Sequence, residues 1–137
     1  MHRPIALALG LGLGLTATAA LAQQEAAPAP QQPATMDAAT TYEAARNQLG
    51  ILKFCEGQGH TGAEATANQQ RLVAMLPQGD DDAGASAEEK GAGGMVSIAG
   101  TELSLADAAS SRGSSVEAQC KQIEAAVNDV AKRLPAG

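Results

Sequence analysis

The chain of 137 residues carries 15 Asp and Glu against 9 Lys and Arg, which gives a formal net charge of −6. An acidic chain without a cluster of basic residues is a poor partner for nucleic acid or for anionic lipid. With one Tyr, one Phe and no Trp, it also lacks the aromatic platforms on which bases stack. We therefore expect no nucleic-acid partner.

The first 22 residues have the layout of a secretory signal peptide. A positive charge at Arg3 precedes an apolar run over residues 5–15, and small residues follow, ending Ala20-Leu21-Ala22. We expect cleavage near Ala22 and export to the periplasm or the medium. The alternative is an uncleaved membrane anchor. Removing residues 1–22 takes away one cation, Arg3, and leaves 115 residues with a net charge of −7.

Residues 23–39 are rich in Pro, Ala and Gln and lack a periodic apolar pattern, so we interpret them as a flexible linker. Residues 40–137 are expected to form one small helical domain. Leu, Ile, Val and Phe number only 16 in the mature 115 residues, below the roughly one-fifth typical of folded domains. The core should therefore be thin, and a covalent link should matter more than usual.

Helix starts are predicted by pairs of capping residues three positions apart, in which the first side chain accepts a hydrogen bond from a free backbone N–H. The pairs are Thr40 with Glu43, Thr61 with Glu64, Ser86 with Glu89, Ser104 with Asp107 and Ser114 with Glu117. They predict up to five helices in the domain.

Glycine and proline mark the expected ends of these helices. The end signals are Gly57 and Gly59, then Pro77, Gly113 and Pro135. Residues 78–86 are expected to form an acidic loop, and the glycines after it should keep the helix from Ser86 short. Residues 95–100, MVSIAG, fit either a short strand or a buried turn, because so short a run does not decide between them.

The last predicted helix has the clearest apolar stripe. Its apolar positions step by four, three, four, three and four along Val116, Cys120, Ile123, Val127, Val130 and Leu134. Such a narrow seam is typical of a packing surface. The fold class predicted from these elements is all-α, a small bundle of four to five short helices stapled by one disulfide.

Cys55 and Cys120 are the only cysteines, and both lie on apolar helical stripes. In an oxidising compartment an even count favours a disulfide between them. The bond would close a loop of 65 residues and stabilise the fold by about 4 kcal/mol in the chain-entropy model. Intermolecular pairing and redox-active thiols are the alternatives.

His60 follows Cys55 by five residues and is the only histidine of the mature chain. Such a pair could be a nucleophilic thiol beside its base or part of a zinc site. Either site needs a free thiol at Cys55, and the expected disulfide would leave none there. We interpret His60 as a loop residue that is a candidate pH-sensitive group. Asp80, Asp81 and Asp82 lack the spacing of a calcium loop. We expect no catalytic residues, no cofactor and no metal, and hence no enzyme.

Three segments carry a resemblance to a known family, namely YEAARNQLGILKFCEGQGHTGAEA, GMVSIAGTELSLADAA and VEAQCKQ. They resemble small secreted bacterial proteins that are labelled pore-forming by analogy with mycobacterial early secreted antigens of the WXG type. The similarity spans most of residues 42–134, and both cysteines match the pattern. The resemblance implies membrane permeabilisation. In architecture alone, the chain is also similar to small periplasmic acid-stress chaperones, which are helical and carry one disulfide.

The sequence thus predicts an exported, non-enzymatic helical protein that acts by binding or assembly, with pore formation as the version that the family label implies. The alternative is a pH-responsive, chaperone-like periplasmic stress protein. A thiol or metal enzyme is a third class, and it would require free thiols. A membrane, another protein or a second copy of the chain all stay open as partners.

Overall fold

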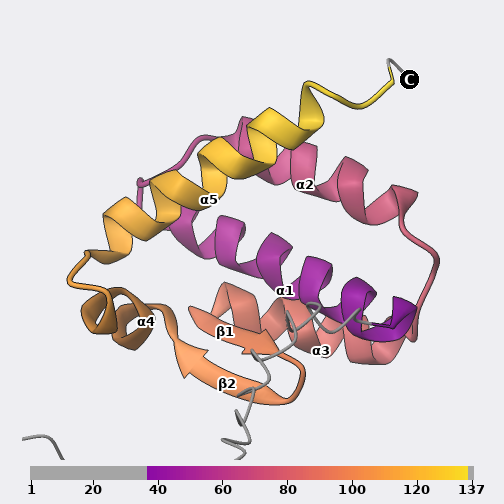
Figure 1. Ribbon diagram of the computed structural model, residues 1–137, viewed down its shortest axis with the longest axis horizontal. Coiled ribbons are helices and arrows are strands. Elements are labelled where there is room, and N and C mark those ends of the chain that lie inside the picture. The colour runs from indigo at the N-terminus through magenta and orange to yellow at the C-terminus, as the bar shows by residue number, and fades with distance from the viewer. Residues whose placement is uncertain (1–36, 136–137) are drawn as a thin grey trace, which may run out of the picture. The chain divides into compact units, whose positions relative to one another are not determined.

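The structure is a computed structural model that describes residues 37–135, so the expected signal peptide at 1–22 and linker residues 23–36 lie outside it. Within this range the chain forms five helices and one hairpin (Figure 1). In chain order the elements are α1 (Ala38–Gly57), α2 (Ala63–Met75), α3 (Asp81–Ala92), β1 (Met95–Ile98), β2 (Thr101–Ser104), α4 (Leu105–Ser111) and α5 (Val116–Ala131). The predicted helical bundle with one disulfide is confirmed, and the undecided segment 95–100 begins the hairpin.

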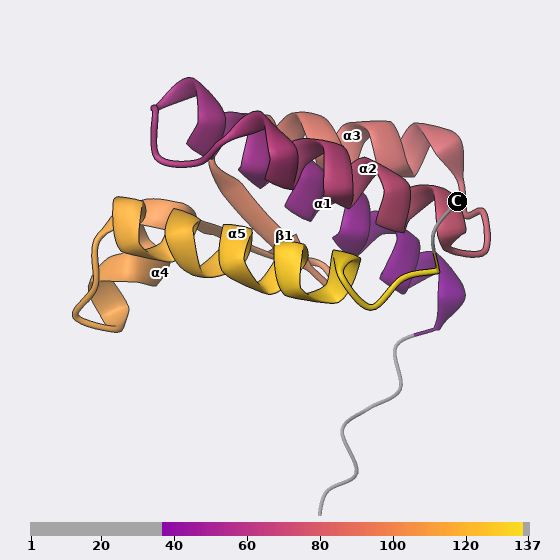
Figure 2. The same cartoon turned by 90° about the horizontal axis from the view of Figure 1, so that it is seen from above.

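α1 is the central helix, and α2, α3, α5 and β1 all pack against it (Figure 1). α3 runs parallel to α1, since Tyr42 meets Asp81 near the start of both helices and Lys53 meets Glu88 further along. α5 runs in the opposite direction, because its early residue Cys120 bonds to Cys55 near the end of α1. Figure 2 shows α4 and α5 as a second layer against the layer of α1, α2 and α3. No helix within residues 37–135 is long and apolar enough to cross a membrane.

Two glycines bring the backbones of α1 and α3 into direct contact. A Cβ atom on Gly50 would lie 2.0 Å from the carbonyl oxygen of Glu88, and one on Gly91 would lie 2.2 Å from that of Asn47. Real Cβ atoms essentially never approach other atoms so closely, so only glycine fits at either position. α3 is therefore held by close backbone packing and not by large apolar side chains, which its sequence lacks.

Two apolar clusters fill the space around α1. One contains Ile51, Cys55, Leu105 and Cys120, and the other contains Leu52, Ala65 and Val127. Ile123 of α5 packs against both clusters. α5 thus connects the two parts of a small core.

One of the five predicted helix caps is confirmed, at Ser104, whose side chain accepts from the N–H of Asp107. The residues at the other cap positions are Asp37 for α1, Gly62 for α2, Asp80 for α3 and Ser115 for α5. The predictions at Thr40, Thr61, Ser86 and Ser114 are wrong. At the starts of α1, α3 and α5 several small polar side chains lie close together and could accept a bond from a free N–H, whereas α2 begins after Gly62 with no side-chain cap. α1 accordingly begins at Ala38, two residues before the expected start of the domain at 40.

Two further expectations are corrected. Residues 81–86, expected in an acidic loop, form the first part of α3. In the predicted seam, Val127 is buried while Val116 and Ile123 pack against the core, but Val130 is 45% exposed. Leu134 lies beyond the end of α5 at Ala131. The seam therefore packs over its first three turns only.

Candidate functional site

An uncharged groove lies between α1, the hairpin and α5. Its volume is about 300 Å³, and it is open to solvent. The lining residues are Ala44, Asn47, Gln48 and Ile51 of α1, Val96 and Ile98 of β1, and Ile123 of α5. The four residues of α1 follow the i, i+3, i+4, i+7 spacing, so one face of this helix forms the floor. We call this hollow the hairpin-side groove.

The hairpin forms one wall of this groove. Val96 pairs with Leu103 across the strands, and Ile98 is two residues along on the same face of the sheet. Ile98 and Leu103 are 50% and 43% exposed, so the apolar face of the hairpin continues outward beyond the groove. The strands are joined by Ala99 and Gly100, which both have positive φ, as a tight two-residue turn requires.

Asn47 fixes the position of that wall. Its side-chain amide donates to the carbonyls of Ala87 and Met95, both at 2.9 Å, and its Oδ1 accepts from the N–H of Ser97 at 3.0 Å. The C=O of Met95 and the N–H of Ser97 are on the free edge of β1, where a neighbouring strand would otherwise bond to them. The side chain of Asn47 takes the place of that strand. With this buried amide fully bonded, the hairpin is held against both α1 and α3. Gln48, the other amide of the floor, makes no hydrogen bond through its side chain within residues 37–135.

A second hollow lies on the other side of α5. It has a volume of about 200 Å³ and is lined by Gln48, Gln69, Leu72, Ala126, Val127 and Val130. Gln48 lines this α2-side hollow as well as the hairpin-side groove. α5 therefore crosses α1 with an open space on each side.

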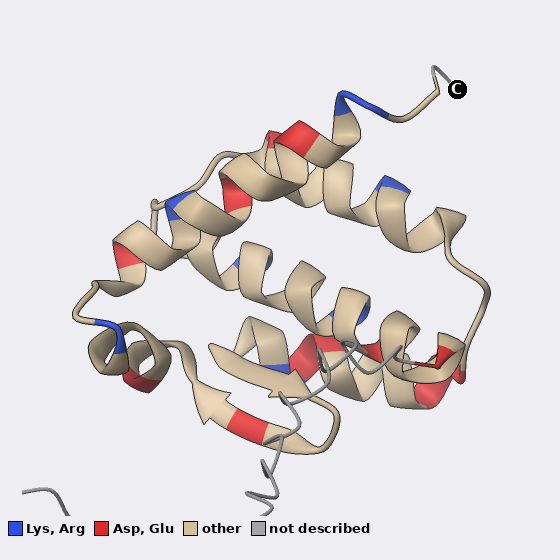
Figure 3. Ribbon diagram, viewed as in Figure 1, with Lys and Arg blue, Asp and Glu red and all other residues tan. Residues whose placement is uncertain are grey.

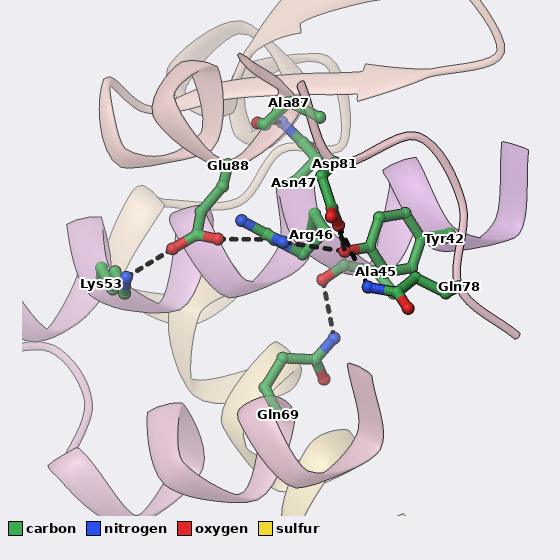
Figure 4. A network of polar contacts seen from close by, with 10 residues as sticks. All are labelled: Tyr42, Ala45, Arg46, Asn47, Lys53, Gln69, Gln78, Asp81, Ala87 and Glu88. Carbon is green, nitrogen blue, oxygen red and sulfur yellow. Dashed lines mark hydrogen bonds and ion pairs between the residues drawn. The ribbon is translucent and has the colours of Figure 1, made fainter. Parts of the chain in front are cut away.

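A polar network joins α1 to α3 away from the apolar clusters (Figure 4). Glu88 accepts from Arg46 at 2.7 Å and from Lys53 at 2.5 Å, and Arg46 also donates to the hydroxyl of Tyr42 at 2.9 Å. That hydroxyl donates to Asp81 at 3.2 Å. Burial by itself would raise the pKa of Glu88, but the hydrogen bonds from Lys53 and Arg46 outweigh it, and the pKa is lowered. Each charged side chain of the network is hydrogen-bonded to another side chain in it, which is the arrangement of a structural contact between helices.

Acid should weaken this contact between α1 and α3. The variant Glu88→Gln should show how much ionised Glu88 contributes to the free energy of unfolding. Because the pKa of Glu88 is lower in the folded chain than its ordinary value of 4.5, ionised Glu88 favours the folded state. This stabilisation is present above the unfolded-state pKa and is lost as pH falls through the folded-state pKa. We expect Glu88→Gln to lower the free energy of unfolding by about 1–2 kcal/mol at neutral pH and to lose this difference below about pH 4.

The measurement is urea unfolding, followed by circular dichroism, between about pH 7 and about pH 3. Glu89→Gln is the matched control, since Glu89 is exposed and forms no ion pair within residues 37–135. A constant difference between Glu88→Gln and the unmutated protein at every pH would contradict the prediction.

The structure confirms the disulfide and resolves the question of the Cys–His pair. Cys55 is bonded to Cys120 with their Cα atoms 5.6 Å apart, and both residues are fully buried. His60 lies in the turn after α1, where its backbone N–H donates to the carbonyl of Cys55 at 2.9 Å. The contact between the two residues is therefore made by the backbone, and the sulfur of Cys55 is already bonded. Within residues 37–135 no three His, Cys, Asp or Glu side chains are grouped to hold a metal ion.

The turn that contains His60 lies against α5. The N–H of Gly62 donates to the carboxylate of Glu124 at 2.9 Å, so α5 supplies the acceptor that the start of α2 lacks locally. The pKa of Glu117 is lowered by the hydrogen bond from Lys121, then by the charge of Lys121 and to a smaller extent by that of His60. His60 is thus near the first turn of α5, and its role as a pH-sensitive group stays a prediction.

Sequence reasoning missed the two hollows beside α5. The spacing of Ala44, Asn47, Gln48 and Ile51 was a usable signal, since it places four uncharged residues on one helical face. The walls come from segments about 50 and 75 residues away from this helical face along the chain. No pattern within a single segment predicts that they meet. Comparison of the chain with protein-family models, with curated proteins and with solved structures finds no match.

Proposed function

We propose that the protein is exported and acts without catalysis, by holding apolar segments of other, partly unfolded polypeptides in the hairpin-side groove. The observation that carries this proposal is the lining of the groove, which consists of seven uncharged residues from three elements. This proposal corresponds to the chaperone-like alternative that the sequence predicts. The groove offers a surface that would accept many apolar sequences. A buried disulfide is consistent with export to an oxidising compartment.

The dimensions of the groove favour a polypeptide segment over an enclosed small molecule. Its volume of about 300 Å³ is at the lower end of the range for small-molecule pockets. It is also open to solvent and continues onto the exposed side chains of Ile98 and Leu103. A bound segment could insert a few apolar side chains there, while the amide of Gln48 bonds to its backbone. Adaptable contacts of this kind suit a binder of low specificity.

Suppression of aggregation tests the proposal. Heat-unfolded citrate synthase serves as the client, and light scattering is followed between about pH 7 and about pH 4, because the predicted function is pH-responsive. We expect the unmutated protein to suppress scattering and Ile98→Asp to lose most of this effect, since a carboxylate on the groove wall must be desolvated on binding.

Met75→Asp is the matched control. Met75 is 56% exposed, which is close to the 50% of Ile98. It lies at the end of α2, however, and does not line the groove. Circular dichroism verifies that both variants fold. Equal suppression by Ile98→Asp and Met75→Asp would contradict the role of the groove, and scattering unchanged by the unmutated protein at every pH would contradict the function.

Membrane permeabilisation, which the family resemblance implies, is the second candidate, and α5 is the helix it would use. The apolar side of α5 carries Cys120, Ile123 and Val127, which pack into the core, and the disulfide ties this side to α1. A membrane could receive this face only after α5 separates from α1. Permeabilisation should therefore require reduction of the disulfide.

Release of a trapped dye from vesicles tests the second candidate. Neutral and anionic vesicles are mixed with micromolar protein, with and without reductant, and the double variant Cys55→Ala/Cys120→Ala serves as a permanently reduced analogue. Release that appears with reductant and with the double variant would support permeabilisation. No dye release in any of these conditions would contradict permeabilisation as a function.

A further inference from the structure

The two halves of α5 are held to the rest of the domain to different extents. The first half is fastened by the disulfide of Cys120, by the bond from Arg112 to buried Gln119 at 3.2 Å, and by the bond from Gly62 to Glu124 at 2.9 Å. These contacts reach α1, α4 and the turn before α2. The first half of α5 is therefore a fixed part of the domain.

The second half, residues 125–131, has few attachments. Within residues 37–135 its only side-chain hydrogen bond to another element joins Asn128 to Asn68 at 3.0 Å. Val127 is its single buried residue, and Val130 on the next turn is 45% exposed. This half lines the α2-side hollow of about 200 Å³ through Ala126, Val127 and Val130, whereas the hairpin-side groove of about 300 Å³ meets α5 at Ile123, just before this half begins. Few buried contacts beside an open hollow are the properties of an element that opens locally.

The floor beneath this half is continuous. Gln48 of α1 lines both hollows, so the two spaces adjoin the same residue from opposite sides of α5. If residues 125–131 moved outward, the hollows would merge into one trough from the hairpin to Leu72 of α2. The movement would expose Val127 and break the bond between Asn68 and Asn128, so the open form would be a minor population that a bound apolar segment could enrich.

We propose that residues 125–131 of α5 form a hinged lid, fixed at the disulfide end, that opens to extend the hairpin-side groove beneath α5 for an apolar polypeptide segment. This inference rests on the proposed function for the identity of the occupant. The lid itself follows from the distribution of contacts along α5. It makes the binding surface larger than the closed structure displays.

Two adjacent alanines of α5 allow a matched test. Both Ala125 and Ala126 are exposed, but only Ala126 lines the α2-side hollow. Ala126→Leu fills that hollow and adds contacts that hold the lid closed, whereas Ala125→Leu makes the same change in side chain and helix propensity outside either hollow. Amide hydrogen exchange, read by mass spectrometry, reports opening of residues 125–131.

We expect Ala126→Leu to slow exchange over residues 125–131 at least threefold and to weaken suppression of citrate synthase aggregation by a similar factor, with Ala125→Leu unchanged in both. Simple fraying of the helix end would respond equally to the two substitutions, and that result would overturn the lid. Slower exchange in Ala126→Leu with undiminished suppression would overturn its link to binding. If Ile98→Asp also leaves suppression intact, the proposed function fails separately, while the exchange rates still decide whether the lid exists.

Discussion

Replacing Gly50 with alanine is expected to lower the free energy of unfolding by about 3 kcal/mol or more, enough to unfold a large part of the population of a small domain. The new Cβ atom would lie 2.0 Å from the carbonyl oxygen of Glu88 and 2.7 Å from the backbone nitrogen of Ala92. Neither atom belongs to a flexible side chain, so α3 as a whole must move away from α1. That movement would also strain the hydrogen bonds of Asn47 and the ion pairs of Glu88.

Two other glycines provide the comparison. Gly91→Ala should be as harmful as Gly50→Ala, because its Cβ would meet the backbone of α1 at 2.2 Å. Gly57→Ala should leave the free energy of unfolding unchanged or raise it by up to about 1 kcal/mol, since its Cβ would meet nothing within 4 Å. Urea unfolding followed by circular dichroism measures all three. Similar stabilities of Gly50→Ala and Gly57→Ala would show that α1 and α3 are not in backbone contact.

Loss of the disulfide is expected to have the second large effect, about 4 kcal/mol for a closed loop of 65 residues in the chain-entropy model. Both cysteines are fully buried in the same apolar cluster, so Cys55→Ala/Cys120→Ala also removes the packing of two sulfur atoms. Net stabilities of about 5–15 kcal/mol are usual, and this core contains few large apolar residues. The double variant should be largely unfolded at moderate urea concentrations, where the oxidised protein is still folded.

Equilibrium unfolding of the oxidised protein, with and without reductant, measures this contribution. The reductant should shift the urea midpoint of the unmutated protein and leave that of Cys55→Ala/Cys120→Ala in place. Titration of the folded, oxidised protein should find no free thiol within residues 37–135. A reductant that leaves the midpoint of the unmutated protein unchanged would show that the loop constraint contributes nothing.

The elements that sequence reasoning located correctly are those with large apolar residues at helical spacing. α1 carries such a stripe through Leu49, Leu52 and Cys55, and the stripe through Cys120, Ile123 and Val127 predicted α5. Because both cysteines lay on these stripes, their pairing was predicted from their even count and from the expected export signal, which itself stays a prediction. The packing of the two helices and the bond between them were therefore predictable without coordinates.

α3 was harder to predict because its contacts are of another kind. Its buried residues are Gly84, Ala87 and Gly91, which carry no apolar periodicity that a hydrophobic pattern could detect. Glycine lowers helix propensity, so the same residues that allow contact with α1 weakened the expectation of a helix there. The candidate site was missed for a related reason. Its walls meet only after β1 and α5 have packed on α1, and no single segment contains the groove.

The bond between Cys55 and Cys120 also determines what a protease can do to the domain. It closes a covalent ring that includes α2, α3, the hairpin and α4, with α1 and most of α5 outside. A single cut inside the ring, for example at the exposed Ala99–Gly100 turn, opens the ring but releases no fragment. The two pieces stay one molecule, and the core that both cysteines share can keep them in register. In an oxidising compartment that contains proteases, a nicked copy would therefore remain an intact covalent unit, and only reduction after the cut would separate its halves.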